Sequence, residues 1–148
     1  RAIGHNKKAV IIQFMKGRKH IGEYKIMEKL KPYYEIYQFG REGWVNLKEP
    51  SAEDKELAKK GLEFAKKAIR EKPFLLILDE INLATAIGLL KLEEVIEFLK
   101  KIPYETTVVL TGRNAPNKLI EMADAVTIMN FLKHPFQKGY MAREGIEY

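Results

Sequence analysis

Apolar residues recur along the chain in two alternating patterns. The first pattern is a short, nearly unbroken apolar run, often rich in β-branched residues. Such runs are typical of strands buried on both faces of a sheet. The run at 34–39 alternates less cleanly with polar residues, and we interpret it as a strand as well. The predicted strands are 9–14, 34–39, 74–78, 106–110 and 125–129.

The second pattern has apolar residues at helical spacing. Ser51 is a good N-cap, and Asp54 stands three residues later, where the partner of a capping box is expected. We therefore predict an amphipathic helix over 52–71. A second helix is predicted around 92–99 and a short third one over 116–122.

Strands and helices thus alternate along the chain. This order predicts an α/β fold with a mostly parallel sheet and helices on both faces. The sequence contains no internal repeat, linker or low-complexity segment. We therefore expect one domain over residues 1–148.

Polar residues follow the predicted strands directly. Ligands of open parallel sheets bind beyond the carboxyl ends of the strands, so these residues are the candidate site. In chain order they are Gln13, Lys16 and Gly17; Asp79 and Glu80; Thr111, Gly112 and Arg113; and Asn130, Lys133 and His134.

The acidic pair Asp79-Glu80 follows four apolar residues, as in a Walker B segment. A carboxylate in that position can hold Mg²⁺ against nucleotide phosphates. Two acids are equally favourable at the N-terminus of a helix, so both interpretations stay open at this point. Arg113 can grip phosphate or ribose oxygens, or form a surface salt bridge. The preceding Thr111-Gly112 favours the first role, because glycine lets a backbone approach a ligand closely.

Trp44 is the only tryptophan, and it lies next to glycines in a predicted loop. It is either a loop anchor in the core or an aromatic plate for a flat ligand. The three histidines, His134 among them, lack metal-ligand spacing. A lone histidine such as His134 is more often structural than catalytic.

Composition narrows the functional classes. The chain has 148 residues, a formal charge of +6 and no cysteine, which excludes a disulfide framework and a thiolate site. No apolar run approaches membrane-spanning length, and no signal peptide opens the chain, so we expect a cytoplasmic protein without membrane contact. The basic charge suits an anionic ligand, but no nucleic-acid-binding signature accompanies it.

Seven groups of short motifs stand in order along the chain. They are Gly4-His-Asn-Lys-Lys8, Val10-Ile-Ile-Gln-Phe-Met-Lys-Gly17 with Gly22-Glu23, Leu78-Asp-Glu-Ile81, Leu89–Val95, Val109-Leu-Thr-Gly-Arg113 with Ala115-Pro116, Lys133-His-Pro-Phe136, and Gly145-Ile-Glu-Tyr148. In this order they resemble the ATP:corrinoid adenosyltransferase family. The resemblance runs from the first residue to the last, and the motifs are specific as a set.

The resemblance implies a P-loop NTPase-like (RecA-like) fold and a homodimer. It implies transfer of the 5′-deoxyadenosyl group of ATP to Co(I) of a reduced corrinoid, with release of triphosphate, and an electron-donor protein is a further implied partner. Such chemistry needs positioning and charge neutralisation rather than acid–base residues. The implied cofactor is Mg²⁺ or Mn²⁺, since hard oxygen ligands favour both.

The resemblance also assigns roles by position. Glu80 would be the carboxylate on the metal, with Asp79 beside it. Arg113, Thr111, Gly112 and Lys16 would contact the nucleotide. Trp44 would lie against the corrinoid with Lys133 and His134, and Phe39 is the candidate for a second aromatic.

The family opens with a strand and a Gly-rich phosphate-binding loop, and no Walker A motif stands in residues 1–148. We expect this segment in the natural protein, because a sheet without it would expose unpaired backbone. Two alternatives stay open on the sequence: another P-loop NTPase or kinase, and a non-enzymatic remnant that binds a corrinoid.

Overall fold

A computed structural model describes residues 1–147 and shows a four-stranded sheet in which every strand pair is parallel. The strands are β1 (Ala9–Phe14), β2 (Tyr34–Phe39), β3 (Leu75–Asp79) and β4 (Thr107–Leu110), and their order across the sheet is β2-β1-β3-β4. The predicted α/β class with a parallel sheet is confirmed. The arrangement is that of P-loop NTPase-like proteins.

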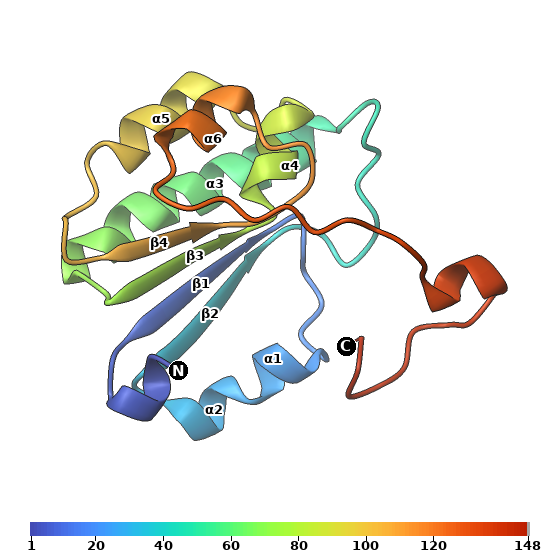
Figure 1. Cartoon of the computed structure of the whole chain (residues 1–148), viewed down its shortest axis with the longest axis horizontal. Helices are drawn as coiled ribbons and strands as arrows, with labels where there is room; N and C mark the ends of the chain where they lie inside the picture. The colour runs from blue at the N-terminus through green and yellow to red at the C-terminus, as the bar shows by residue number, and fades with distance from the viewer. Residues whose placement is uncertain (148) are drawn as a thin grey trace.

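Helices cover both faces of the sheet (Figure 1). The helices above the sheet in that view are α3 (Ala52–Ala68), α4 (Ile81–Ala86), α5 (Leu92–Leu99) and α6 (Asn117–Met122). Those below are α1 (Gly22–Lys25) and α2 (Met27–Leu30), and the 3₁₀ turns are η1 (Ile3–His5), η2 (Ile69–Glu71) and η3 (Pro135–Lys138). The predicted helices are confirmed to within a few residues, whereas α1, α2 and α4 were not foreseen.

The main core lies between the sheet and the upper helices. Side chains alternate between the faces of a strand, so Ile12 and Phe14 of β1 point to one face together. Both are fully buried, as is Leu78 of β3. They pack with Leu62 of α3 and Val95 of α5 in one cluster.

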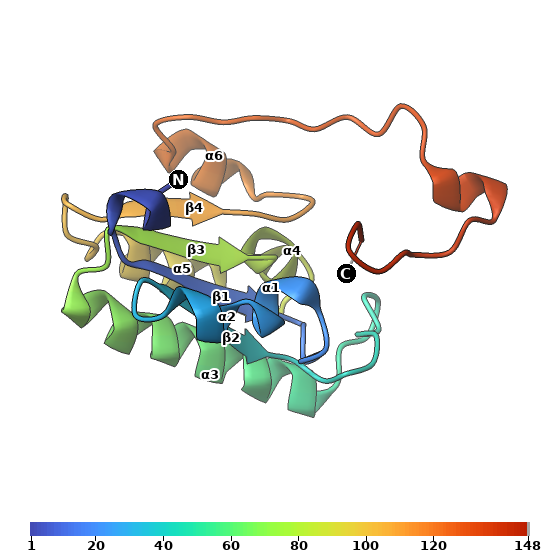
Figure 2. The same cartoon turned by 90° about the horizontal axis from the view of Figure 1, so that it is seen from below.

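On the opposite face of the sheet, side chains become more exposed to solvent from β2 towards β4. Ile36, Ile11, Ile77 and Val109 stand in one register row from β2 to β4. Ile36 is 2% exposed, but Val109 at the far end is 38% exposed. The short helices α1 and α2 therefore protect the β2 side of this face better than the β4 side (Figure 2).

The predicted strand at 125–129 is wrong. Residues 123–134 form neither helix nor strand, and every described residue from Ile120 onward is exposed. β-Branched residues favour a strand only where a neighbouring strand supplies hydrogen bonds and packing, and this segment pairs with no strand of the described sheet. Within residues 1–147, no helix is long and apolar enough to cross a membrane.

Candidate functional site

Asp79 lies at the centre of a polar network at the carboxyl edge of the sheet. Its Oδ1 accepts a hydrogen bond from Thr111 Oγ1 at 2.8 Å. Its Oδ2 accepts from Lys16 Nζ at 2.6 Å and from Gln13 Nε2 at 3.1 Å. Three of the predicted site residues, Asp79, Lys16 and Thr111, therefore meet because the parallel strands end at the same edge.

A row of amides extends this network across the sheet. Gln13 is opposite Asp79 on one side and opposite Gln38 on the other. Gln38 Nε2 donates to Gln13 Oε1 at 2.9 Å, and Gln13 is only 3% exposed. Sequence reasoning did not assign a role to Gln38. The signal was available in hindsight, since Gln13 is the one polar residue in the run 9–14 and Gln38 stands at the equivalent place near the end of the next strand.

Glu80 differs from Asp79 although the two are adjacent. Its backbone is left-handed, with φ of 64°, and its N–H donates to Thr111 Oγ1 at 3.0 Å. Its Oε2 is buried and accepts no hydrogen bond within the part of the chain that the structure describes. A buried carboxylate oxygen without a donor is costly, so this atom is suited to a cation that arrives with a ligand.

Gly112 fits closely beside Glu80. A Cβ atom at Gly112 would stand 3.2 Å from both Cα and Oε2 of Glu80, and its φ of 120° is one that other residues rarely adopt. Glycine is therefore required here for two reasons. Arg113 follows Gly112 in the chain, and its side chain is exposed.

The residues present fit a divalent cation held largely by its ligand. Glu80 offers a free hard oxygen, whereas both oxygens of Asp79 are engaged by donors. Among residues 1–147 no group of three or more His, Cys, Asp or Glu side chains could enclose a metal. Mg²⁺ characteristically takes one or two protein carboxylates and completes its octahedron with phosphates and water.

Trp44 lies on the surface rather than in the core. It is 90% exposed, and its loop follows β2 at the carboxyl edge (Figure 1). The Arg18 guanidinium lies over the indole, 5.8 Å from its centroid. The structure thus excludes the core-anchor interpretation and leaves an aromatic surface. Phe39, by contrast, packs inward against Phe64 of α3, with ring centroids 5.5 Å apart.

Lys133 and His134 lie in the exposed segment after α6. His134 stacks on Phe131 with centroids 5.7 Å apart, and its Nδ1 accepts from the N–H of Phe136. Both figures show this segment leaving the sheet and running past its carboxyl edge. The contacts of His134 are with Phe131 and Phe136 of its own segment, whereas those of Asp79 are with Thr111, Lys16 and Gln13. The segment returns to α1 only near its end, where Lys25 Nζ lies 3.6 Å from Glu144.

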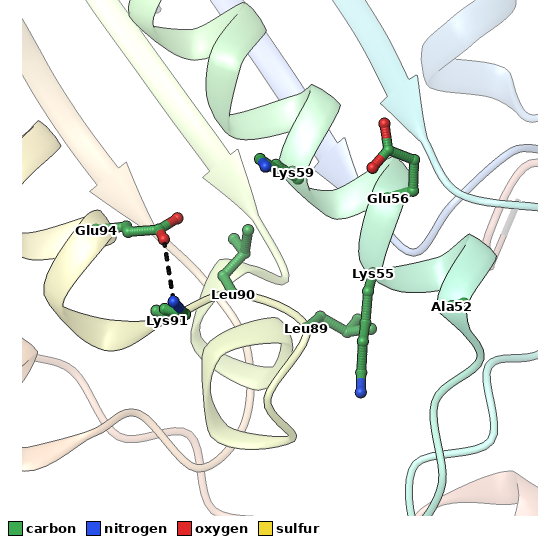
Figure 3. Close-up of a pocket in the computed structure, with 8 residues that line it drawn as sticks. All are labelled: Ala52, Lys55, Glu56, Lys59, Leu89, Leu90, Lys91 and Glu94. Atoms are coloured by element: carbon green, nitrogen blue, oxygen red, sulfur yellow. Dashed lines mark ion pairs between the residues drawn. The ribbon is translucent and has the colours of Figure 1, made fainter.

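A surface groove of about 370 Å³ lies apart from these residues (Figure 3). It runs between the first turns of α3 and the α4–α5 connection, and Lys55, Lys59 and Lys91 lie along it with Glu56 and Glu94. Its charges are mixed, and none of the predicted site residues lines it. The carboxyl edge is therefore the better candidate site.

The four-stranded parallel sheet with helices on both faces places the chain in the α/β class with a P-loop NTPase-like arrangement, and acidic, hydroxyl and basic groups meet at its carboxyl edge. Comparison with known proteins gives the family within that class. Residues 1–148 match the family described as ATP:corrinoid adenosyltransferase BtuR/CobO/CobP. The chain belongs to this family.

Individual relatives agree. The chain is 41% identical over 151 residues to a corrinoid adenosyltransferase of Sinorhizobium sp, and the match covers all of this chain and 70% of that protein. It is 32% identical to the corrinoid adenosyltransferases of Escherichia coli and Pseudomonas aeruginosa, again over the whole chain and 74% and 73% of theirs. These matches support the adenosyltransferase interpretation over another P-loop NTPase and over a non-enzymatic remnant.

Proposed function

We propose that this protein transfers the 5′-deoxyadenosyl group of ATP to the cobalt of a reduced corrinoid. Co(I) attacks C5′ of the ribose, a Co–C bond forms, the C5′–O bond breaks, and triphosphate leaves with the bonding electrons. The observation that carries this proposal is the family match over the whole chain. The carboxyl edge agrees with it, since it offers the charged groups and hydrogen bonds that positioning and charge neutralisation require.

We assign the metal to Glu80, whose buried Oε2 accepts no hydrogen bond from the described residues. Mg²⁺ bound there would neutralise charge on the leaving triphosphate. Asp79 has a different task, because its oxygens hold Lys16 and Thr111 in place. Thr111 in turn fixes the backbone N–H of Glu80. We therefore regard Asp79 as the organiser of this edge and Glu80 as the direct ligand.

The nucleotide and the corrinoid would share the carboxyl edge. Arg113 and Lys16 are cations suited to phosphate or ribose oxygens, and Gly112 allows a close approach. Trp44 presents an exposed aromatic face for the flat corrin ring. We keep Lys133, His134 and Phe39 as corrinoid candidates on the resemblance alone, since none of them lies beside Trp44 in an observed contact.

The proposal has three further parts. They are a homodimer, an electron-donor protein that reduces the corrinoid cobalt to Co(I), and a cytoplasmic location. The first two rest on the family resemblance. The third is carried over from the sequence-based expectation, and the cysteine-free composition is compatible with a reducing compartment.

An anaerobic absorbance assay with ATP, Mg²⁺ and chemically reduced cobalamin tests the proposal. Wild-type protein should form light-sensitive adenosylcobalamin. Glu80→Gln keeps the size of the side chain but removes its charge, and we expect turnover to fall by about 10²–10³-fold, as when one transition-state contact is lost. Glu93→Gln, on the exposed face of α5, is the matched control and should leave turnover unchanged.

Two outcomes would contradict the proposal. Folded wild-type protein that binds ATP but forms no adenosylcobalamin would reject the transfer reaction. Corrinoid-independent release of phosphate from ATP at comparable rates would instead favour a general P-loop NTPase. Full activity of Glu80→Gln would reject the metal assignment alone.

A further inference from the structure

The loop between β2 and α3 carries Trp44, and a partly buried ion pair joins its first residues to α3. Arg41 Nε donates to Asp54 Oδ1 at 2.9 Å, and Arg41 Nη2 donates to Asp54 Oδ2 at 3.0 Å. This is the two-pronged geometry that a guanidinium makes with a carboxylate, and it restrains orientation as well as distance. The Asp54 side chain is 2% exposed and that of Arg41 is 40% exposed.

Asp54 itself is held rigidly. Its N–H donates to Ser51 Oγ, and its Oδ2 accepts from the N–H of Ser51, which completes the capping box of α3. Arg41 and Ser51 together lower the pKa of Asp54, with the Arg41 hydrogen bonds as the larger cause. The carboxylate therefore links the Trp44 loop to a 17-residue helix that packs on the sheet.

The backbone at the start of the loop, around Gly40, packs closely against the segment that follows β1. A Cβ atom on Gly40 would lie 2.3 Å from the backbone nitrogen of Lys16, and a Cβ atom on Gly17 would lie 2.5 Å from the carbonyl oxygen of Gly40. Beyond this backbone contact, Arg18 Nε donates to the Glu42 carbonyl at 3.1 Å. The base of the Trp44 loop is thus clamped between α3 and the segment that bears Lys16.

This clamp has a functional consequence. An exposed aromatic residue on a free loop would lose conformational entropy when a flat ligand settles on it, and this loss weakens binding. A loop that is already fixed does not incur that loss. We propose that Arg41 and Asp54 are positioning residues that hold Trp44 at the sheet edge and thereby set the affinity for the corrinoid. This proposal rests on the proposed function.

Trp44 is the only tryptophan, so its fluorescence reports this loop directly. The test compares wild type with Arg41→Gln, which removes the fork, and Arg41→Lys, which keeps the charge but not the bidentate geometry. Ser51→Ala disturbs the cap of α3 and leaves Arg41 in place. Arg70→Gln, on an exposed turn, controls for loss of an arginine.

Two measurements are made on each protein. Time-resolved anisotropy of Trp44 reports nanosecond motion of the loop without any ligand. Quenching of Trp44 by hydroxocobalamin gives a dissociation constant, and steady-state assays give KM for ATP and for the corrinoid. We expect faster Trp44 motion in Arg41→Gln, a corrinoid Kd and KM raised about tenfold, which corresponds to about 1.4 kcal/mol, and an ATP KM within about twofold of wild type.

The expected pattern has Arg41→Lys between wild type and Arg41→Gln. Ser51→Ala should be shifted less than Arg41→Gln, because it loses hydrogen bonds to Asp54 but keeps the Arg41 pair, and Arg70→Gln should match wild type in both measurements. Unchanged Trp44 motion in Arg41→Gln would overturn the anchoring. Increased motion with an unchanged corrinoid Kd would overturn the positioning role. Failure of wild type to form adenosylcobalamin would count against the proposed function, and the ligand-free anisotropy would still decide the anchoring.

Discussion

Two adjacent acidic residues have opposite environments at the end of β3. Asp79 accepts one hydrogen bond at Oδ1 and two at Oδ2, whereas no donor within residues 1–147 reaches the buried Oε2 of Glu80. The difference arises from the backbone, because the left-handed conformation of Glu80 turns its side chain out of the strand alternation. A sequence pattern that finds both acids cannot divide their roles.

Asp54 makes stability depend on pH in a defined direction. Hydrogen bonds from Arg41, and then from Ser51, hold the pKa of Asp54 below its ordinary value of about 4. A carboxyl group with a lowered folded-state pKa stabilises the protein above its unfolded-state pKa. That contribution is lost as the pH falls through the folded-state pKa.

Thermal unfolding of wild type and Asp54→Asn between pH 3 and pH 7 tests this dependence. Near neutral pH we expect the variant to melt about 2–4 °C lower, as loss of a cap worth about 1 kcal/mol implies for a chain of this size. The gap should narrow below about pH 4. The exposed Asp124→Asn variant should follow wild type throughout, and a gap that widens in acid would contradict the assignment.

At the scale of elements, the close packing of α3 on the sheet depends on one glycine, Gly61. A Cβ atom at Gly61 would stand 2.9 Å from Phe14 Cε1 and 3.1 Å from Phe39 Cβ. Phe14 is fully buried within the core cluster. Gly61 therefore lets a helix approach two aromatic side chains, which explains a glycine where helix propensity alone disfavours one.

Gly61→Val should destabilise the fold by about 1–3 kcal/mol, the usual cost of overpacking a core. Urea unfolding measures the free energy. Lys67→Val on the exposed side of α3 is the control, because it introduces the same β-branched residue without a core contact. A loss in Gly61→Val no larger than the loss in Lys67→Val would contradict crowding against Phe14 as the cause.

At the scale of the whole molecule, one apolar cluster joins the sheet to the helices above it. The cluster includes residues of β1, β3, α3, α4 and α5, so these elements share their stability. We accordingly propose one cooperative domain. The segment after α6 is outside this core and is exposed over its described length.

Leu78→Ala tests this cooperativity. Leu78 is fully buried at the centre of the sheet, and truncation should cost about 2–5 kcal/mol. Far-UV circular dichroism and Trp44 fluorescence should report one coincident transition, shifted to lower denaturant. Leu132→Ala, at a position 92% exposed, should have almost no effect. Separate transitions for the two probes would contradict a single domain.

Local patterns in the sequence were sufficient for β1, β2, β3, β4 and α3. Their apolar periods and the Ser51 cap are properties of neighbouring residues, and the structure confirms them. The same reasoning placed Asp79, Lys16 and Thr111 at one edge, because parallel strands end together. It failed at 125–129, where the apolar pattern of a strand is present but no partner strand lies alongside.

The sequence by itself determined the fold class, the family and the residue types at the carboxyl edge, because these depend on periodicity and on motifs read in order. The tertiary structure alone decided the strand order β2-β1-β3-β4 and the Gln38–Gln13–Asp79 row. It also decided that Asp79 is engaged while Glu80 Oε2 is free, and that Arg41 reaches Asp54. Each of these contacts depends on which distant segments pack together, and no local pattern specifies that.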